Sequence, residues 1–226
     1  TDLSFDQLRA AFDRTATLAE RARSLIAGRI ESIIHRKTPK PLENGPLWVI
    51  HVVPIAGLTG RKTVDLAALD SKAWRQLLGA DWVSGSRAFN LDGLVFHPSG
   101  STNGRYYTYH HIFRTGAMEG VRLGGKVVPG LDGDPERSIV WSLGMSGFFR
   151  DTLDSFIQSV KGFGFSGPVV LNVAALHVGG YALAIANTYH GLGPTAPDRP
   201  HLVIPEIWIE DLDTVNIDDA VRPLMD

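Results

Sequence analysis

Apolar residues recur at helical spacing near the start of the chain and predict two helices, over residues 5–14 and 18–36. Ser4 and Thr17 each begin a capping box, in which a hydroxyl group and a Gln or Glu three residues later bond to free N–H groups of the first turn. Pro39 lacks the N–H group that a helix needs, and it ends the second helix. The apolar faces are Phe5, Leu8 and Phe12 in the first helix and Leu18, Ala22, Leu25, Ile26, Ile30 and Ile33 in the second.

A different pattern follows, in which short apolar runs alternate with turn residues. Residues 47–55, LWVIHVVPI, are almost continuously apolar and rich in β-branched side chains, which is typical of a strand buried on both faces. A helix is predicted over 65–79, where Asp65 can cap the start and Gly79 the end. Residues 89–123 predict three strands in a meander, with a loop at 98–104 and a hairpin turn at 115–116.

The second half of the chain repeats this order. A short strand at 138–142 precedes a helix from Ser146 to Gly162, and strands are predicted over 168–176, 181–187 and 202–211. Both halves have the order strand, helix and three strands, which predicts a degenerate internal duplication. The predicted class is α+β, with a mainly antiparallel sheet flanked by helices and two N-terminal helices leading in.

Composition and charge exclude several classes of function. The net charge of −2 excludes a globally basic nucleic-acid-binding protein, but it permits a local basic patch. The absence of cysteine excludes disulfides, thiolate metal sites and cysteine nucleophiles, and no apolar run has the length of a membrane span. We therefore expect a cytoplasmic protein with no membrane partner. The chain begins at Thr1, from which we expect residues 1–40 to link an upstream domain to an α+β domain over 41–226.

Several stretches together resemble the region that follows the AlbA-type, DNA-binding domain in bacterial Schlafen-like proteins, which are also described as ATP-binding. The stretches are FDQLRAAF, LAERARSLIAGRI, TPKPL, LWVIHVVPIAG, RAFNLDGLVFH, YHHIFRTGAMEGV and LVIPEIWIED. The resemblance implies an accessory or regulatory role, an upstream Schlafen-like domain as partner, and no catalytic residue in this chain. Thr115-Gly116 stands where family members have Asn-Gly, a departure that affects the turn and not the chemistry.

Motifs for the common catalytic sites are missing. The sequence has no HExxH, GxSxG, GxxxxGK[ST] or GxGxxG pattern, so we predict no cofactor, no resident metal and no catalytic residue. Glu206 and Glu210 are predicted on one face of a strand, which suits either a charged edge strand or an acid/base pair. The alternative function is therefore a metal-dependent hydrolase or nuclease that uses His51 or His111 with these two glutamates.

The histidines have structural interpretations as well. His51 lies in the middle of the apolar run, where a buried neutral imidazole is the simpler expectation. His110 and His111 are adjacent on a strand and point to opposite faces, so one metal ion does not easily bind both. His111 shares its face with an aromatic row that is either packing or a platform for stacking bases. The row consists of Tyr107, Tyr109 and Phe113.

Basic residues are concentrated in the N-terminal segment. A charge run of this kind is most often a solvated helix face, and the alternative is contact with phosphates of a nucleic-acid backbone. An α-helix spreads such residues around its circumference, so we expect weak binding without sequence preference. The other candidate partners are a nucleic-acid backbone and a further protein. The candidate contact residues are Arg21, Arg23, Arg29, Arg36, Lys37 and Lys40.

Overall fold

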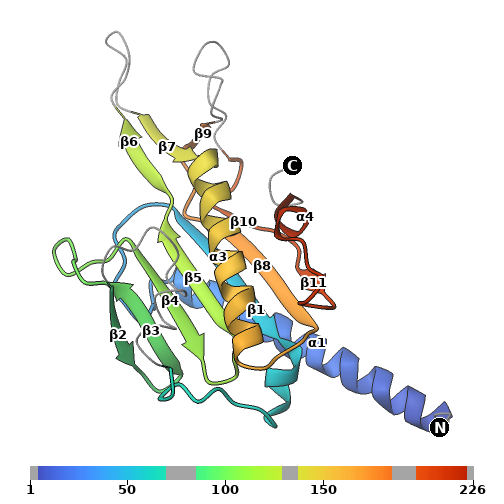
Figure 1. Ribbon diagram of the computed structural model, residues 1–226. Helices are drawn as coiled ribbons and strands as arrows, with labels where there is room; N and C mark the ends of the chain where they lie inside the picture. Colours follow the sequence, from blue (N-terminus) through green and yellow to red (C-terminus); the bar gives the residue numbers. More distant parts are fainter. Residues whose placement is uncertain (1–4, 70–84, 129–136, 185–196, 223–226) are drawn as a thin grey trace.

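A large antiparallel sheet lies between two long helices in the computed structural model, which describes residues 5–69, 85–128, 137–184 and 197–222 (Figure 1). Helix α1 (Phe5–Ile34) covers one face of the sheet and α3 (Ser142–Gly162) covers the other. The strands of this sheet are β1 (Leu47–Pro54), β2 (Gly85–Phe89), β3 (Gly93–Pro98), β4 (Thr108–Phe113), β5 (Met118–Leu123), β8 (Val169–Leu176), β10 (His201–Val203) and β11 (Ile207–Ile209). The class predicted from the sequence, a mainly antiparallel sheet flanked by helices, is confirmed.

The strand order places β1 in the interior of the sheet, between β8 and β5. The order is β10-β8-β1-β5-β4-β3-β2, and β11 also pairs with β8. The predicted meander over 89–123 is confirmed as β3, β4 and β5, with β2 added at its edge. A second sheet contains β6 (Gly125–Val128), β7 (Arg137–Trp141) and β9 (Ala182–Ala184), and the remaining described elements are the 3-10 helix η1 (Ile55–Thr59) and α4 (Ile217–Val221).

Strand β1 is buried along its whole length, as its apolar run predicts. Side chains of a strand alternate between faces, so Ile50 and Val52 pack toward α3 while Val49 and Val53 pack toward α1. Helix α3 can approach closely because a Cβ on Gly120 of β5 would lie 2.9 Å from Ile50 Cγ2 and 3.2 Å from a ring carbon of Phe156. The sheet therefore has two apolar cores, one under each helix.

The N-terminal segment differs from its prediction. One continuous helix, α1, replaces the two helices expected over 5–14 and 18–36. Thr17 is a good capping residue, but residues 14–18 contain no Pro or Gly, and a Thr inside a helix costs only a few tenths of a kcal/mol. The helix therefore continues through the predicted break.

Other boundaries also differ. Helix α3 begins at Ser142 and not at Ser146, and its end at Gly162 agrees with the prediction. The strand predicted over 202–211 is two strands, β10 and β11, separated by Pro205, which cannot donate a ladder hydrogen bond. Asp65 Oδ1 accepts the N–H groups of Ala67 and Ala68 as a cap would, but the rest of the helix predicted there falls largely on residues outside the described ranges.

The topology does not confirm an internal duplication. In the first half, three consecutive strands form the meander of β3, β4 and β5, whereas in the second half β9 leaves β8 and pairs in parallel with β7 of the small sheet. Within the described residues, no helix is long and apolar enough to cross a membrane.

Candidate functional site

A row of polar residues crosses the face of the sheet that α1 covers. Four neighbouring strands contribute one residue each at the same level: Asn172 of β8 is opposite His51 of β1, His51 is opposite Glu119 of β5, and Glu119 is opposite His111 of β4. All four residues are buried, and Glu119 is completely inaccessible to solvent. Buried polar groups need hydrogen-bond partners, and a row of them in an apolar core is therefore the candidate functional site of this fold.

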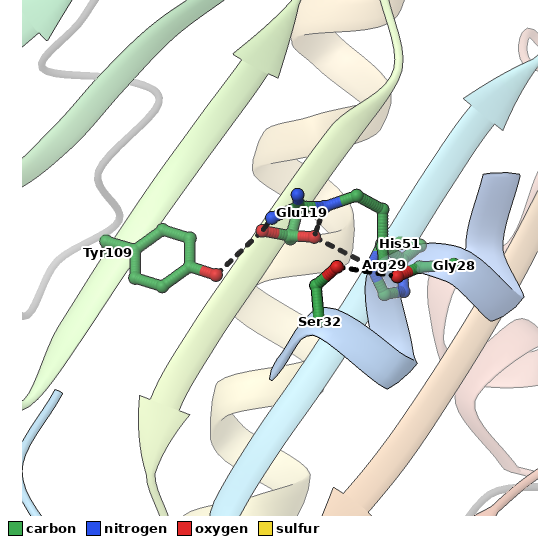
Figure 2. Close-up of polar contacts among 6 residues, drawn as sticks. All are labelled: Gly28, Arg29, Ser32, His51, Tyr109 and Glu119. Atoms are coloured by element: carbon green, nitrogen blue, oxygen red, sulfur yellow. Dashed lines mark hydrogen bonds and ion pairs between the residues drawn. The ribbon is translucent and has the colours of Figure 1, made fainter. Parts of the chain in front are cut away.

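Within the row, the carboxylate of Glu119 is the group around which Arg29, His51 and Tyr109 gather (Figure 2). Its Oε1 accepts hydrogen bonds from Tyr109 Oη at 2.7 Å and from Arg29 Nη2 at 2.9 Å. Its Oε2 accepts from Arg29 Nε at 2.8 Å and lies 3.0 Å from His51 Nε2. An ionised carboxylate only accepts, so His51 carries its hydrogen on Nε2. Four contacts use the four lone-pair positions of the carboxylate.

Arg29 comes from α1 and closes the row from above the sheet. The helix places it there because Ala22, Ile26, Ile30 and Ile33 form the buried stripe of α1, and Arg29 is beside that stripe. Its guanidinium grips Glu119 with two parallel hydrogen bonds, the strongest geometry that this pair of side chains can form. The guanidinium carbon also lies 5.4 Å from the centre of the Phe113 ring, within range of a cation–π interaction.

The electrostatics of this pair favour its charged form. Burial by itself raises the pKa of Glu119, but the hydrogen bonds from His51 and Arg29 outweigh burial and hold that pKa well below its usual range. Burial by itself lowers the pKa of Arg29. The hydrogen bonds and the negative charge of the Glu119 carboxylate outweigh burial and raise the pKa of the guanidinium. The positive and negative charges of this pair cancel inside the core.

Two further titratable side chains beside Glu119, those of Tyr109 and His111, are neutral at pH 7. Burial, and then the nearby charge of Glu119, raise the pKa of Tyr109 well above its usual range. Burial lowers the pKa of His111 to about 4, in spite of the neighbouring Glu119. The His111 and Phe113 ring centroids are 4.1 Å apart with the ring planes tilted by 37°, and neither nitrogen of His111 has a hydrogen-bond partner among the described residues. His111 thus behaves as an aromatic core residue.

The chemistry open to this cluster is limited by access and by proton affinity. A general base needs a lone pair directed at its substrate and a pKa near the working pH. Glu119 has all of its acceptor positions occupied, and its lowered pKa makes it a weak base. A substrate could reach it only if α1 left the sheet. We therefore interpret the cluster of Arg29, His51, Tyr109 and Glu119 as a clamp, called the Glu119 clamp below.

The residues of the predicted hydrolase site lie in different places. His51 contacts Glu119, and His111 is the neighbour of Glu119 on the other side. Glu206 instead pairs with Arg23 of α1 at 2.5 Å, and Glu210 is exposed after the end of β11. In the described part of the chain, no three His, Asp or Glu side chains are grouped so that they could hold a metal ion.

The six candidate nucleic-acid contacts fall into two groups, those that bond to other parts of the protein and those on or near the surface. Arg29 is in the Glu119 clamp and Arg23 is paired with Glu206. The guanidinium of Arg36 donates to the backbone carbonyls of Glu43 and Gly45. The other three candidates are on or near the surface: Arg21 and Lys37 are exposed, and Lys40 is half-buried. In the aromatic row, Tyr109 and Phe113 are buried in the core under α1, and Tyr107 is exposed.

Sequence reasoning missed Glu119, the most important residue of the cluster. The only local signal is a glutamate inside a short strand whose other residues are mostly buried. Its partner Arg29 is 90 residues away in the sequence, and only the fold brings the two together. Comparisons with protein-family models, with curated proteins and with solved structures give no significant match.

Proposed function

We propose that this chain is a non-catalytic accessory or regulatory domain of a bacterial Schlafen-like protein and mediates protein, ligand or nucleic-acid-backbone contacts. The observation that carries the proposal is the state of Glu119. Its carboxylate is inaccessible to solvent, it has four hydrogen-bonding contacts, and it is covered by α1. The polar side chains with the most suitable chemistry for catalysis are used to attach a helix.

The course of α1 supports a linking role. The ion pair between Arg23 and Glu206 lies next to β11 at the edge of the sheet, and the ion pair between Arg29 and Glu119 lies near its centre. Ala19 and Ala22 are still buried against the sheet, so the part of α1 that extends beyond that edge is residues 5–17 (Figure 1), over about 20 Å at 1.5 Å per residue. A helix anchored at one end by the Glu119 clamp can hold a neighbouring domain at a fixed distance and orientation.

The experiment that tests this function is a search for turnover. The purified chain is incubated with phosphodiester, phosphomonoester and carboxylic ester substrates, each with Mg²⁺, Mn²⁺ or Zn²⁺. We expect rates equal to the background, because no substrate can reach the carboxylate of Glu119 while α1 is in place.

A hydrolase would give a different pattern across two variants. Glu119→Gln alters the cluster, and Arg150→Gln removes an exposed cation on the opposite side of the sheet. Turnover that is lost in a folded Glu119→Gln variant and kept in Arg150→Gln would contradict the proposed function.

A further inference from the structure

Four basic residues lie together where α1 ends, and we call them the cationic corner: Arg36, Lys37, Lys40 and Arg105. None of the four forms an ion pair with a described residue, whereas Arg23 and Arg29 of the same helix both do. The basic residues of the N-terminal segment thus differ in whether a carboxylate neutralises them. Two are neutralised by carboxylates of the sheet, and those at the end of the helix keep their charge.

Arg36 has an unusual backbone conformation that fixes its place in the corner. Its φ of 56° is left-handed, and its N–H bonds to Ile33 O at 3.0 Å while that of Lys37 bonds to Ser32 O at 2.8 Å, as in a Schellman helix end. Glycine is the usual residue at such a position because a side chain there costs about 1 kcal/mol or more. Two of the five N–H groups of the guanidinium donate hydrogen bonds to the backbone carbonyls of Glu43 and Gly45.

Arg105 is fixed by a tight hairpin between β3 and β4. Thr102 and Arg105 exchange backbone hydrogen bonds of 2.8 and 2.9 Å across Asn103 and Gly104. Both central residues have positive φ, which is the signature of a type I′ turn. Arg105 Nη1 donates to Leu42 O at 3.0 Å, so Arg36 and Arg105 are held by carbonyls of the same short segment, residues 42–45.

The positive charge of the corner affects its neighbours. Burial and then the charge of Arg105 lower the pKa of Arg36. Burial lowers the pKa of His97 in spite of its hydrogen bond with Pro98, and the charge of Lys40 lowers it further. Burial and then the charge of Arg36 lower the pKa of His177. The end of the α1 dipole supplies only about half of a negative charge and Glu43, in the segment that holds Arg36, supplies one more, which together do not balance four cations.

We propose that the cationic corner binds the phosphate backbone of single-stranded nucleic acid. Free guanidinium N–H groups held in place by backbone carbonyls suit the bidentate recognition of phosphate. Tyr107, 36% exposed and two residues after Arg105, offers a ring on which an unpaired base can stack. This inference rests on the proposed accessory function and names the surface and the class of ligand.

The test is fluorescence anisotropy with a labelled single-stranded oligothymidine of about 20 nucleotides, measured from about 50 to 200 mM salt. The first variant combines Lys37→Gln, Lys40→Gln and Arg105→Gln and leaves Arg36 in place. The matched control combines Arg150→Gln, Lys161→Gln and Arg222→Gln, which removes the same charge from cations that are paired with carboxylates elsewhere. Melting temperatures show that the variants are folded.

The wild type is expected to bind with a salt slope of about −3, from about 0.7 per phosphate contact and four cations. The corner variant should lose at least about tenfold in affinity at low salt and most of this slope, while the control keeps both. Lys37→Gln alone, at an exposed position, should reduce the slope by about 0.7 and serves if the triple variant does not fold. Arg36→Gly, which suits the left-handed backbone, should also weaken binding.

Several results would overturn the inference. They are no binding by the wild type, equal losses in the corner and control variants, tighter binding of duplex than of single strands, and binding of phosphatidylserine vesicles without binding of the oligonucleotide. These results leave the non-catalytic function standing. Cleavage of the oligonucleotide would instead contradict the proposed function, so the two failures can be told apart.

Discussion

Replacing Glu119 by Gln should destabilise the protein by about 3 kcal/mol. The substitution keeps the size of the side chain and removes the charge that compensates Arg29. Removing one partner of a buried ion pair costs about 3–5 kcal/mol, since the other charge is left in the core. The Arg29 side chain is 18% exposed and can regain part of its hydration, so we expect a value at the lower end of that range.

The same helix provides a matched control. Arg23 and Glu206 form an ion pair of the same residue types, but their side chains are 54% and 31% exposed. Exposed pairs contribute about 0–1 kcal/mol, so Arg23→Gln should change the free energy of unfolding by less than about 1 kcal/mol. The contrast between the two variants separates the effect of burial from the effect of losing an ion pair.

Urea unfolding at pH 7 measures both variants. A slope of about 2–3 kcal/mol per M converts the loss in Glu119→Gln into a decrease of about 1–1.5 M in the unfolding midpoint. Combining Glu119→Gln with Arg29→Met should cost less than the sum of the single changes, by about 1–3 kcal/mol. A cost below 1 kcal/mol for Glu119→Gln, or an equal cost for Arg23→Gln, would refute the clamp.

The contribution of Glu119 to the free energy of unfolding depends on pH in a definite direction. The folded pKa of Glu119 is below the unfolded value of about 4.3, so the unfolded state takes up a proton first as the pH falls. The stability that Glu119 contributes is complete above about pH 5 and is lost as the pH decreases below that value. The difference between wild type and Glu119→Gln should therefore be constant from pH 7 to 5 and become smaller in more acidic buffers.

Two further predictions concern the histidines of the row. His51→Asp should lower the free energy of unfolding by several kcal/mol or prevent folding, because it places a second carboxylate opposite Glu119 in the core. His51→Asn should be less destabilising. Equal melting temperatures for wild type and His51→Asp would show that this strand is not buried. The pKa of His111 is lowered to about 4, so its neutral form contributes stability above about pH 6.5 that is lost as the pH falls toward 4, roughly 3 kcal/mol in all. His111→Leu should remove this part of the pH dependence in urea titrations, and an unchanged pH profile would contradict the assignment.

The parts of the fold that depend on local pattern could be predicted from the sequence. The apolar run of β1 and the turn at Thr115-Gly116 carry their signals within a few residues, and both are confirmed. The break near Thr17 was wrong, because a capping signal competes with the helix propensity of the residues around it and does not by itself end a helix. The single strand expected over 202–211 is wrong because Pro205 has no N–H group to donate to the ladder and divides the apolar run into two strands.

The candidate site could be predicted only in part. The place of His51 inside an apolar run predicts a buried imidazole, and the side chain is buried beside Glu119. The basic character of α1 is also visible in the sequence, but periodicity cannot tell which arginine meets a carboxylate. Arg29 and Glu119 meet because β5 pairs with β1 and α1 crosses them, which is a property of the tertiary structure. Arg105 was missed because it lies 65 residues beyond Lys40, on another element.

Native-state hydrogen exchange of α1 is the most direct test of the central claim that the Glu119 clamp holds this helix permanently on the sheet. The amides of residues 26–33 should exchange with the same free energy as those of β1 and β5, through global unfolding. Exchange of these α1 amides several kcal/mol below the protection of β1 and β5 would contradict the claim. That result would make α1 a lid that opens while the sheet remains folded and would give solvent access to Glu119.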